Sequence, residues 1–115
     1  MTKPKHVEVS QIEFLAAMEK PSIRVVENAT VDGVSMRGWT EDDIISVGRK
    51  QHEKSAYAHD MVSTLIHEML HYLRPKASER WVQRRELAWY ADDKVRAAAA
   101  IRLLNAVLFD VKETV

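Results

Sequence analysis

The residues of this sequence best suited to chemistry are two histidines four positions apart, in the segment His67-Glu68-Met69-Leu70-His71. On a helix, side chains four apart stand one turn above each other on the same face, so the imidazoles of His67 and His71 can reach one metal ion. Glu68 lies about 100° around the helix from His67 and does not fit the same ligand set. It can instead take a proton from a water molecule bound to the metal, as a general base does. The segment therefore predicts metal-assisted hydrolysis.

Such a metal would need a third protein ligand, and the sequence contains no cysteine to supply it. Histidine and carboxylate side chains remain, and these suit zinc. Glu79 is the first candidate, because it opens a helix that a short turn should lay back beside the first helix, near the level of His71. Glu86 lies two helical turns later, nearer the level of His67, and is the second candidate. Weaker alternatives are His52, His59, Asp92 and Asp93.

The motif is short, so its setting matters to its interpretation. It falls in the middle of the most apolar helical segment, residues 61–74, where histidine and glutamate are destabilising unless they have partners. Glu79 has an ordinary explanation as well, because acids are favoured at the positive end of a helix. The competing interpretation is a metal-free helical interaction module in which the histidines are satisfied by hydrogen bonds within the core.

The segments around the motif predict an α+β fold in a single domain that spans residues 1–115. We expect an N-terminal helix, a small antiparallel or mixed sheet of three strands, the motif helix, a glutamate-bearing helix and a final packing helix. Asp32-Gly33 predicts a tight turn, Pro75 ends the motif helix and Ser78 caps the next one. The expected bounds are 7–20 for the first helix, 23–26, 34–39 and 44–47 for the strands, and 61–74 and 93–111 for the motif helix and the last helix.

The segment from Thr64 to Pro75 resembles the active-site helix of the zincin metallopeptidases. It is most similar to the small SprT-like and minigluzincin types of bacteria and phages, in which a second helix supplies a glutamate. The resemblance covers about residues 40–90, and its specific part is residues 64–79. This sequence lacks the third histidine of metzincins and the C-terminal zinc ribbon of some SprT proteins, which argues against cleavage of DNA-protein crosslinks as its activity.

Carried over to this sequence, the resemblance implies a zinc-dependent metallopeptidase that acts on a peptide or protein substrate. It makes His67 and His71 zinc ligands, Glu68 the general base and Glu79 the third ligand. The alternative function is a non-catalytic, phage-type protein on a zincin frame that occludes a host partner.

Two further features follow from the same resemblance. In zincins, an edge strand ahead of the metal helix commonly pairs with the extended substrate, and Ile44–Gly48 is expected to be that strand. A tyrosine or histidine often stabilises the oxyanion, and the candidates for this role are Tyr57, Tyr72 and Tyr90.

The composition restricts the remaining classes of partner. Lys plus Arg and Asp plus Glu each number 17, which argues against a nucleic-acid binder that works by bulk charge. No apolar run approaches the roughly 20 residues of a membrane span, and no signal core follows the N-terminus, so we expect a cytoplasmic protein. The last helix is apolar on more than one side, which leaves monomer and homodimer equally open.

Overall fold

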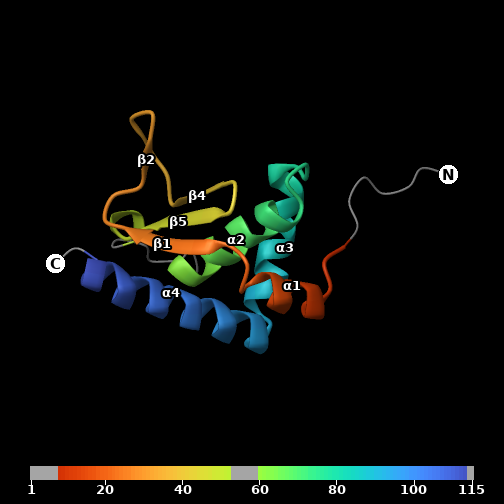
Figure 1. Cartoon of the computed structure of the whole chain (residues 1–115). Helices are drawn as coiled ribbons and strands as arrows, with labels where there is room; N and C mark the ends of the chain where they lie inside the picture. Colours follow the sequence, from red (N-terminus) through yellow and green to blue (C-terminus); the bar gives the residue numbers. More distant parts are fainter. Residues whose placement is uncertain (1–7, 53–59, 114–115) are drawn as a thin grey trace.

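The structure is a computed structural model that describes residues 8–52 and 60–113 of the 115-residue chain. It confirms the predicted α+β fold, with one helix, the strands and then three helices in chain order (Figure 1). The elements are α1 (Gln11–Ala17), β1 (Ser22–Val26), β2 (Thr30–Val31), β3 (Val34–Ser35), β4 (Gly38–Glu41), β5 (Ile44–Gly48), a 3₁₀ turn (Lys50–His52), α2 (Met61–Leu73), α3 (Glu79–Tyr90) and α4 (Asp93–Glu113).

The main sheet is mixed, with the strand order β1-β5-β4. β5 pairs in parallel with β1, placing Ile45 beside Ile23, and in antiparallel fashion with β4, placing Ser46 beside Trp39. The prediction that Ile44–Gly48 is an edge strand is therefore wrong, because that segment is the central strand. Its side chains are buried, as a strand covered on both sides requires. The edge strand next to α2 is β4.

The expected strand over residues 34–39 is divided into two shorter strands. β2 and β3 form a small antiparallel hairpin, and β4 begins only at Gly38. Asp32 and Gly33 form the turn of this hairpin with φ angles of 52° and 79°, which a glycine adopts without strain. The turn predicted at this pair is confirmed, and the hairpin extends from the sheet toward one end of β4 (Figure 1).

The helix bounds follow from local capping groups. Asp60 caps α2 by accepting a hydrogen bond from the backbone N–H of Ser63, and Ser78 caps α3 by accepting one from Trp81. The first helix is shorter than expected because Ser10 caps it at Gln11, while residue 7 lies outside the described residues. Only the five residues 74–78 separate α2 from α3, so α3 returns alongside α2.

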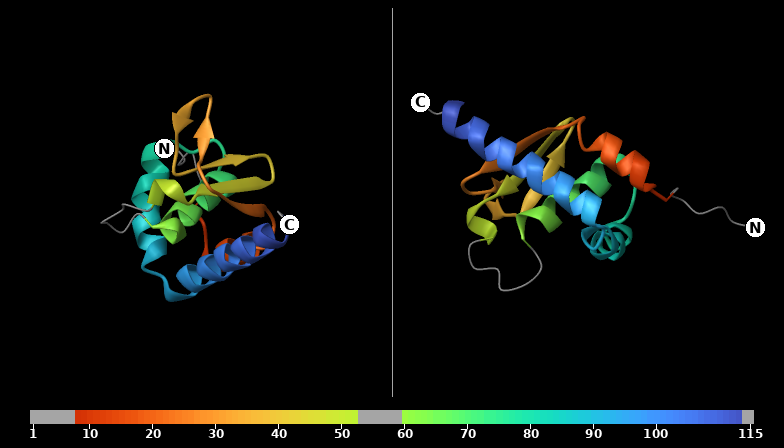
Figure 2. Two further views of the ribbon diagram at one scale, coloured as in Figure 1. Left: turned by 90° about the vertical axis from the view of Figure 1, so that its left-hand side faces the viewer. Right: turned by 90° about the horizontal axis from the view of Figure 1, so that it is seen from below.

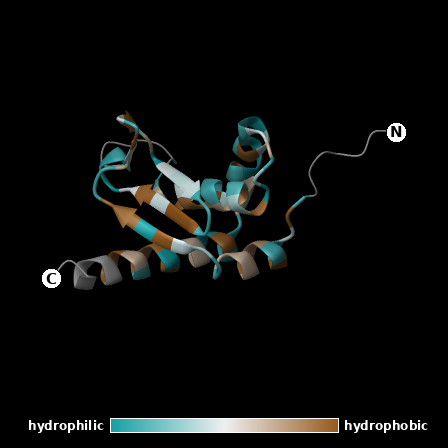
Figure 3. Cartoon of the chain, turned by 45° about the horizontal axis from the view of Figure 1, so that its top comes forward, coloured by the Kyte–Doolittle hydropathy of each residue, from teal (hydrophilic) through white to brown (hydrophobic). Residues whose placement is uncertain are grey.

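The hydrophobic core lies between the sheet and the helices (Figures 1 and 2). α2 packs against β4 and β5, α4 packs along β1 and α2, and α3 contacts both of these helices. Figure 3 shows hydrophobic residues along the strands of the main sheet, which contact α2 and α4. The largest fully buried side chains include Phe14, Met18, Ile45, Leu65, Ile66, Met69, Leu70 and Val82. None of the described helices has the length and apolar character to cross a membrane.

Candidate metal centre

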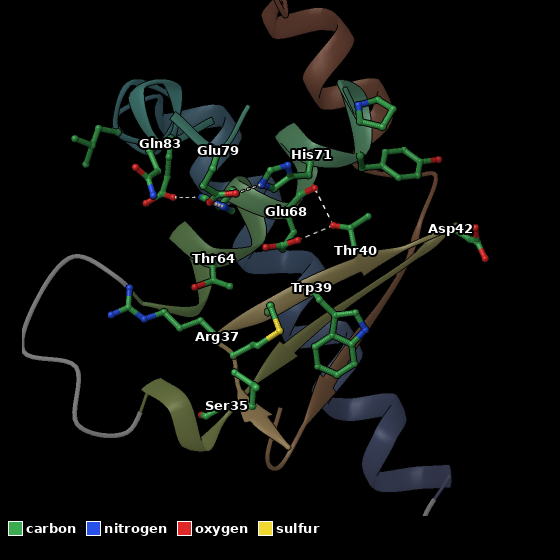
Figure 4. Close-up of a pocket in the computed structure, with 18 residues that line it drawn as sticks. Ser35, Arg37, Trp39, Thr40, Asp42, Thr64, Glu68, His71, Glu79 and Gln83 are labelled. Carbon is green, nitrogen blue, oxygen red and sulfur yellow. Dashed lines mark hydrogen bonds and ion pairs between the residues drawn. The ribbon is translucent and has the colours of Figure 1, made fainter. Parts of the chain in front are cut away.

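The two helices that follow the sheet bring three potential metal ligands together. His67 and His71 stand one turn apart on α2, with ring centroids 4.9 Å apart. Glu79 is the first residue of α3, and the short turn before it returns its side chain to the level of the two histidines. The geometry expected from the spacing, in which Glu79 lies near His71, is confirmed (Figure 4).

The carboxylate of Glu79 contacts both histidines at once. Its Oε1 lies 2.6 Å from Nε2 of His67, and its Oε2 lies 2.8 Å from Nε2 of His71. One ligand atom from each of the three residues lies within 4.8 Å of the other two. Zinc bonds to nitrogen and oxygen are about 2.0–2.2 Å long, so these atoms are close enough to share one ion. His67, His71 and Glu79 therefore form a group that could hold a metal ion.

Glu86, the alternative third ligand, contacts the opposite side of the His67 ring. Its Oε1 lies 2.6 Å from Nδ1 of His67, whereas Glu79 faces Nε2 of the same ring. Because a carboxylate only accepts, Nδ1 carries the proton in this pair. By the same reasoning Nε2, which lies 2.6 Å from Oε1 of Glu79, shares a proton with that carboxylate, and a metal ion bound at Nε2 would replace this proton while Nδ1–H stays on Glu86. Glu86 is thus placed to orient a ligand, as carboxylates behind metal-binding histidines commonly do.

Opposing effects act on the pKa of His67. Burial of the ring disfavours its charged form, but the hydrogen bond to Glu86 and the negative charges of Glu68, Glu79 and Glu86 outweigh this effect and raise the pKa. A site surrounded by three carboxylates therefore attracts positive charge, whether a proton or a metal cation. The donor set of two imidazoles and one carboxylate fits a cation of intermediate softness, such as zinc.

Glu68 lies beside the ligand group and faces the edge strand. The hydroxyl of Thr40 on β4 donates to Oε1 of Glu68 over 2.7 Å (Figure 4). Only 8% of Glu68 is exposed, and this burial raises the pKa of its carboxyl, against the hydrogen bond from Thr40, which lowers it. The carboxylate is held in one orientation beside both histidines, which suits a residue that transfers protons.

The close approach of β4 to α2 depends on Gly38. A Cβ atom at this position would lie 2.8 Å from the backbone oxygen of Ser46, 2.8 Å from Cγ2 of Thr64 and 3.4 Å from Cγ of Glu68. Real Cβ atoms are not found at the two shorter distances, so only glycine fits here without movement of the strand or the helix. Neither Gly38 nor Thr40 could be identified from the sequence, because both act through contacts between distant segments.

The candidate ligands open into a cleft of about 1360 Å³ between β4, α2 and α3 (Figure 4). This volume exceeds the roughly 300–1,000 Å³ of typical small-molecule pockets. Met36, Arg37, Asp42, Tyr72 and Leu87 also line the cleft. Arg37, just before β4, and Asp42, just after it, lie at opposite ends of this strand (Figure 4). A cleft of this size suits an extended chain.

The weaker ligand alternatives lie elsewhere or outside the described residues. His52 is held between the carbonyl oxygen of Gly48, 2.5 Å from Nδ1, and the hydroxyl of Thr64, 2.8 Å from Nε2, which gives it a structural role. Asp92 caps α4 by accepting a hydrogen bond from the backbone N–H of Val95. Asp93 pairs with Arg96, while His59 is not among the described residues.

Of the three tyrosines considered for the oxyanion, Tyr72 lines the cleft. Its hydroxyl donates to Asp43 over 3.4 Å, and burial together with the nearby negative charge of Asp43 raises its pKa. Tyr90 instead donates to Asp60 at the start of α2, and Tyr57 lies outside the described residues.

Comparison of the chain with known protein families, curated proteins and solved structures found no match. A function for this site must therefore be inferred from its residues and their geometry.

Proposed function

We propose that this chain is a zinc-dependent metallopeptidase of the zincin type. The observation that carries the proposal is the position of Glu68 beside a three-residue donor group, His67, His71 and Glu79, at the wall of a large cleft. Two metal-binding histidines and a carboxylate, with a second carboxylate free of the ligand set, are the protein groups that zinc-assisted hydrolysis requires.

The edge strand supports a peptide as the substrate. β4 is hydrogen-bonded to β5 on one side, and its other side borders the cleft, as seen for Thr40 in Figure 4. An extended peptide added antiparallel to β4 would pass in front of Glu68 and the ligand group. Backbone pairing of this kind gives affinity with little dependence on the substrate sequence.

The roles of the protein groups follow from their contacts. His67, His71 and Glu79 would hold the zinc ion, and Glu86 would keep the Nε2 atom of His67 free for it. When bound, zinc would supply a Lewis acid that lowers the pKa of a water molecule and polarises a carbonyl group. Glu68 would accept the proton of the attacking water and deliver it to the leaving amine.

Metal content is the first test of the proposal. Purified, tag-free protein should contain about one zinc per chain by elemental mass spectrometry, because the three donors converge on one position. A His67→Ala, His71→Ala double variant should contain none, and a His52→Ala variant is the matched control that should keep its zinc. A wild-type chain that takes up no metal after zinc is added would contradict the proposal.

Turnover is the second test, measured with fluorescently labelled unfolded proteins and peptide libraries. The zinc-loaded wild type should cleave substrate, while Glu68→Gln should bind one zinc and lose turnover by at least about 10³-fold, because the proton acceptor is gone. Equal activity of the two proteins would exclude the mechanism. Bound zinc with no cleavage by the wild type would instead favour the non-catalytic binding protein.

A further inference from the structure

The longest helix, α4, carries two apolar stripes rather than one. The first faces the core and consists of Val95, Ala99, Leu103 and Ala106, all buried. Helix periodicity places a second stripe on the opposite side. It consists of Ala97, Ile101, Leu104 and Leu108, all exposed.

The second stripe is unusual for a helix that faces solvent. Ile101, Leu104 and Leu108 are 59%, 60% and 55% exposed, whereas the outer side of a surface helix normally carries charged residues. Seen from below, α4 lies in front of the sheet and α2, and no described element covers its outer side (Figure 2). A continuous apolar stripe in such a position marks an interaction surface.

The spacing of the stripe identifies a helix as its partner. The steps from Ala97 to Ile101, Leu104 and Leu108 are four, three and four residues, which is the heptad seam of a pair of helices. The exposed side of α3 carries Arg80, Gln83 and Arg84 around a single large apolar residue, Leu87, so among the described elements α4 alone presents such a seam. We propose that the stripe pairs with the same stripe of a second copy of this chain, forming a homodimer through α4.

The sizes of the side chains favour an antiparallel pair. Two antiparallel copies would place Ala97 opposite Leu108, and Ile101 opposite Leu104, so that a small residue meets a large one at each end of the seam. A parallel pair would place Ala97 opposite Ala97 and leave a gap, while Leu108 would meet Leu108. Complementary packing therefore selects the antiparallel, two-fold symmetric arrangement.

The residues that flank the stripe argue against a membrane surface as the partner. Ala100 and Val107 lie on one side of it, and Lys94 and Asn105 lie on the other. Helices that lie on membranes have a basic rim of several Lys or Arg residues beside the apolar face. The seam from Ala97 to Leu108 is about 17 Å long, which is short for a stable interface, so we expect a dissociation constant of about 1–100 µM.

Sedimentation equilibrium over 1–300 µM protein tests the dimer. The average mass of the wild type should rise from that of one chain toward that of two. Leu104→Glu should remain a single chain at every concentration, because it places two charges in the seam. Ile12→Glu is the matched control, since it adds the same charge at an 82% exposed isoleucine of α1, and it should dimerise like the wild type. Circular dichroism of each variant confirms that it is folded.

Crosslinking tests the orientation of the two helices. Because the sequence contains no cysteine, only the introduced cysteines react with the reagent. With a short bis-maleimide reagent, Ala97→Cys and Leu108→Cys should crosslink efficiently when mixed and poorly when each is treated alone. Efficient crosslinking of each variant alone would overturn the antiparallel arrangement. A wild type that stays monomeric at 300 µM, or a Leu104→Glu protein that dimerises normally, would overturn the proposed interface. Binding of the monomer to anionic vesicles, lost in Leu104→Glu, would overturn it in favour of a membrane surface.

Discussion

Glu86 Oε1 lies 2.6 Å from Nδ1 of His67, on the side of the ring away from Glu79. Both partners are largely removed from solvent, with side-chain exposures of 9% for Glu86 and 16% for His67. The hydrogen bond fixes the ring orientation and keeps a proton on Nδ1, so a metal ion, if bound, would be held through Nε2. Two acidic residues of one helix therefore act on opposite sides of the same imidazole.

The first prediction concerns the role of Glu86 as a positioning residue. Glu86→Ala should lower zinc affinity about 10–100-fold, because the ring of His67 loses its orienting acceptor. Glu86→Gln keeps an oxygen that can accept from Nδ1–H and should retain most of the affinity. Competition with a chromophoric chelator measures both values. If Glu86→Ala lost zinc as completely as Glu79→Ala, Glu86 would be a ligand; unchanged affinity would exclude both roles.

The second prediction concerns the hydrogen bond between Thr40 and Glu68. Thr40→Val preserves the shape of the side chain but removes the donor 2.7 Å from Oε1 of Glu68. We expect kcat/KM to fall about 10-fold or more, since a hydrogen bond to a charged group contributes about 1.5–3 kcal/mol. Zinc content should not change. Thr30→Val, at an exposed threonine of β2, is the matched control and should keep full activity; an equal loss in both variants would show a general effect on folding.

Local signals were enough to predict the helices that carry the site. The apolar period of residues 61–74, Pro75 after the helix and Ser78 before the next one are all short-range features, and each has the predicted effect in the structure. These features also predicted the contact between Glu79 and His71. A connection of only five residues brings α3 back alongside α2, which places Glu79 near His71.

Long-range pairing could not be predicted in the same way. The edge position assigned to Ile44–Gly48 was wrong because strand order depends on which distant segment pairs with it, here β1. One signal favoured the observed order: Ile44-Ile45-Ser46-Val47 contains no charged residue, as is typical of a strand covered on both sides. The contacts of Thr40 with Glu68 and of Glu86 with His67 join different elements of the fold. They therefore cannot be predicted from the spacing of residues in the sequence.

The third prediction concerns the contact between β4 and α2. Gly38→Ala should lower the free energy of unfolding by about 1–3 kcal/mol, because the added Cβ meets the backbone oxygen of Ser46 and Cγ2 of Thr64 at 2.8 Å each. Ser46 belongs to β5, and the backbone of this strand cannot move away from the added Cβ without disturbing the sheet. Urea unfolding measures the change, and Val34→Ala, at a 61% exposed strand residue, should change stability by at most about 0.5 kcal/mol. A Gly38→Ala protein as stable as the wild type would show that the strand has room to move.

The fourth prediction concerns an ion pair that joins α1 to the end of α2. Arg74, the C-cap of α2, donates to both carboxylate oxygens of Glu13 over 2.9 and 3.0 Å. The hydrogen bonds from Arg74, stronger than the opposing effect of burial, lower the pKa of Glu13 from its ordinary value of 4.5. The pair therefore adds stability that is present above the unfolded pKa and is lost as the pH falls through the lowered one.

Urea unfolding of the wild type and Glu13→Gln at pH 7 and at about pH 2.5 measures this contribution. Glu13 is 39% exposed, so solvent screening limits the difference at pH 7 to about 1 kcal/mol at most. The difference should be smaller at the lower pH, because the wild-type carboxyl becomes protonated as the pH falls through its lowered pKa. In an Arg74→Gln background, Glu13→Gln should change stability by only a few tenths of a kcal/mol. A difference that stays constant with pH would instead mean that the substitution disturbs the packing of α1, because loss of a charge pair must follow the titration of its carboxylate.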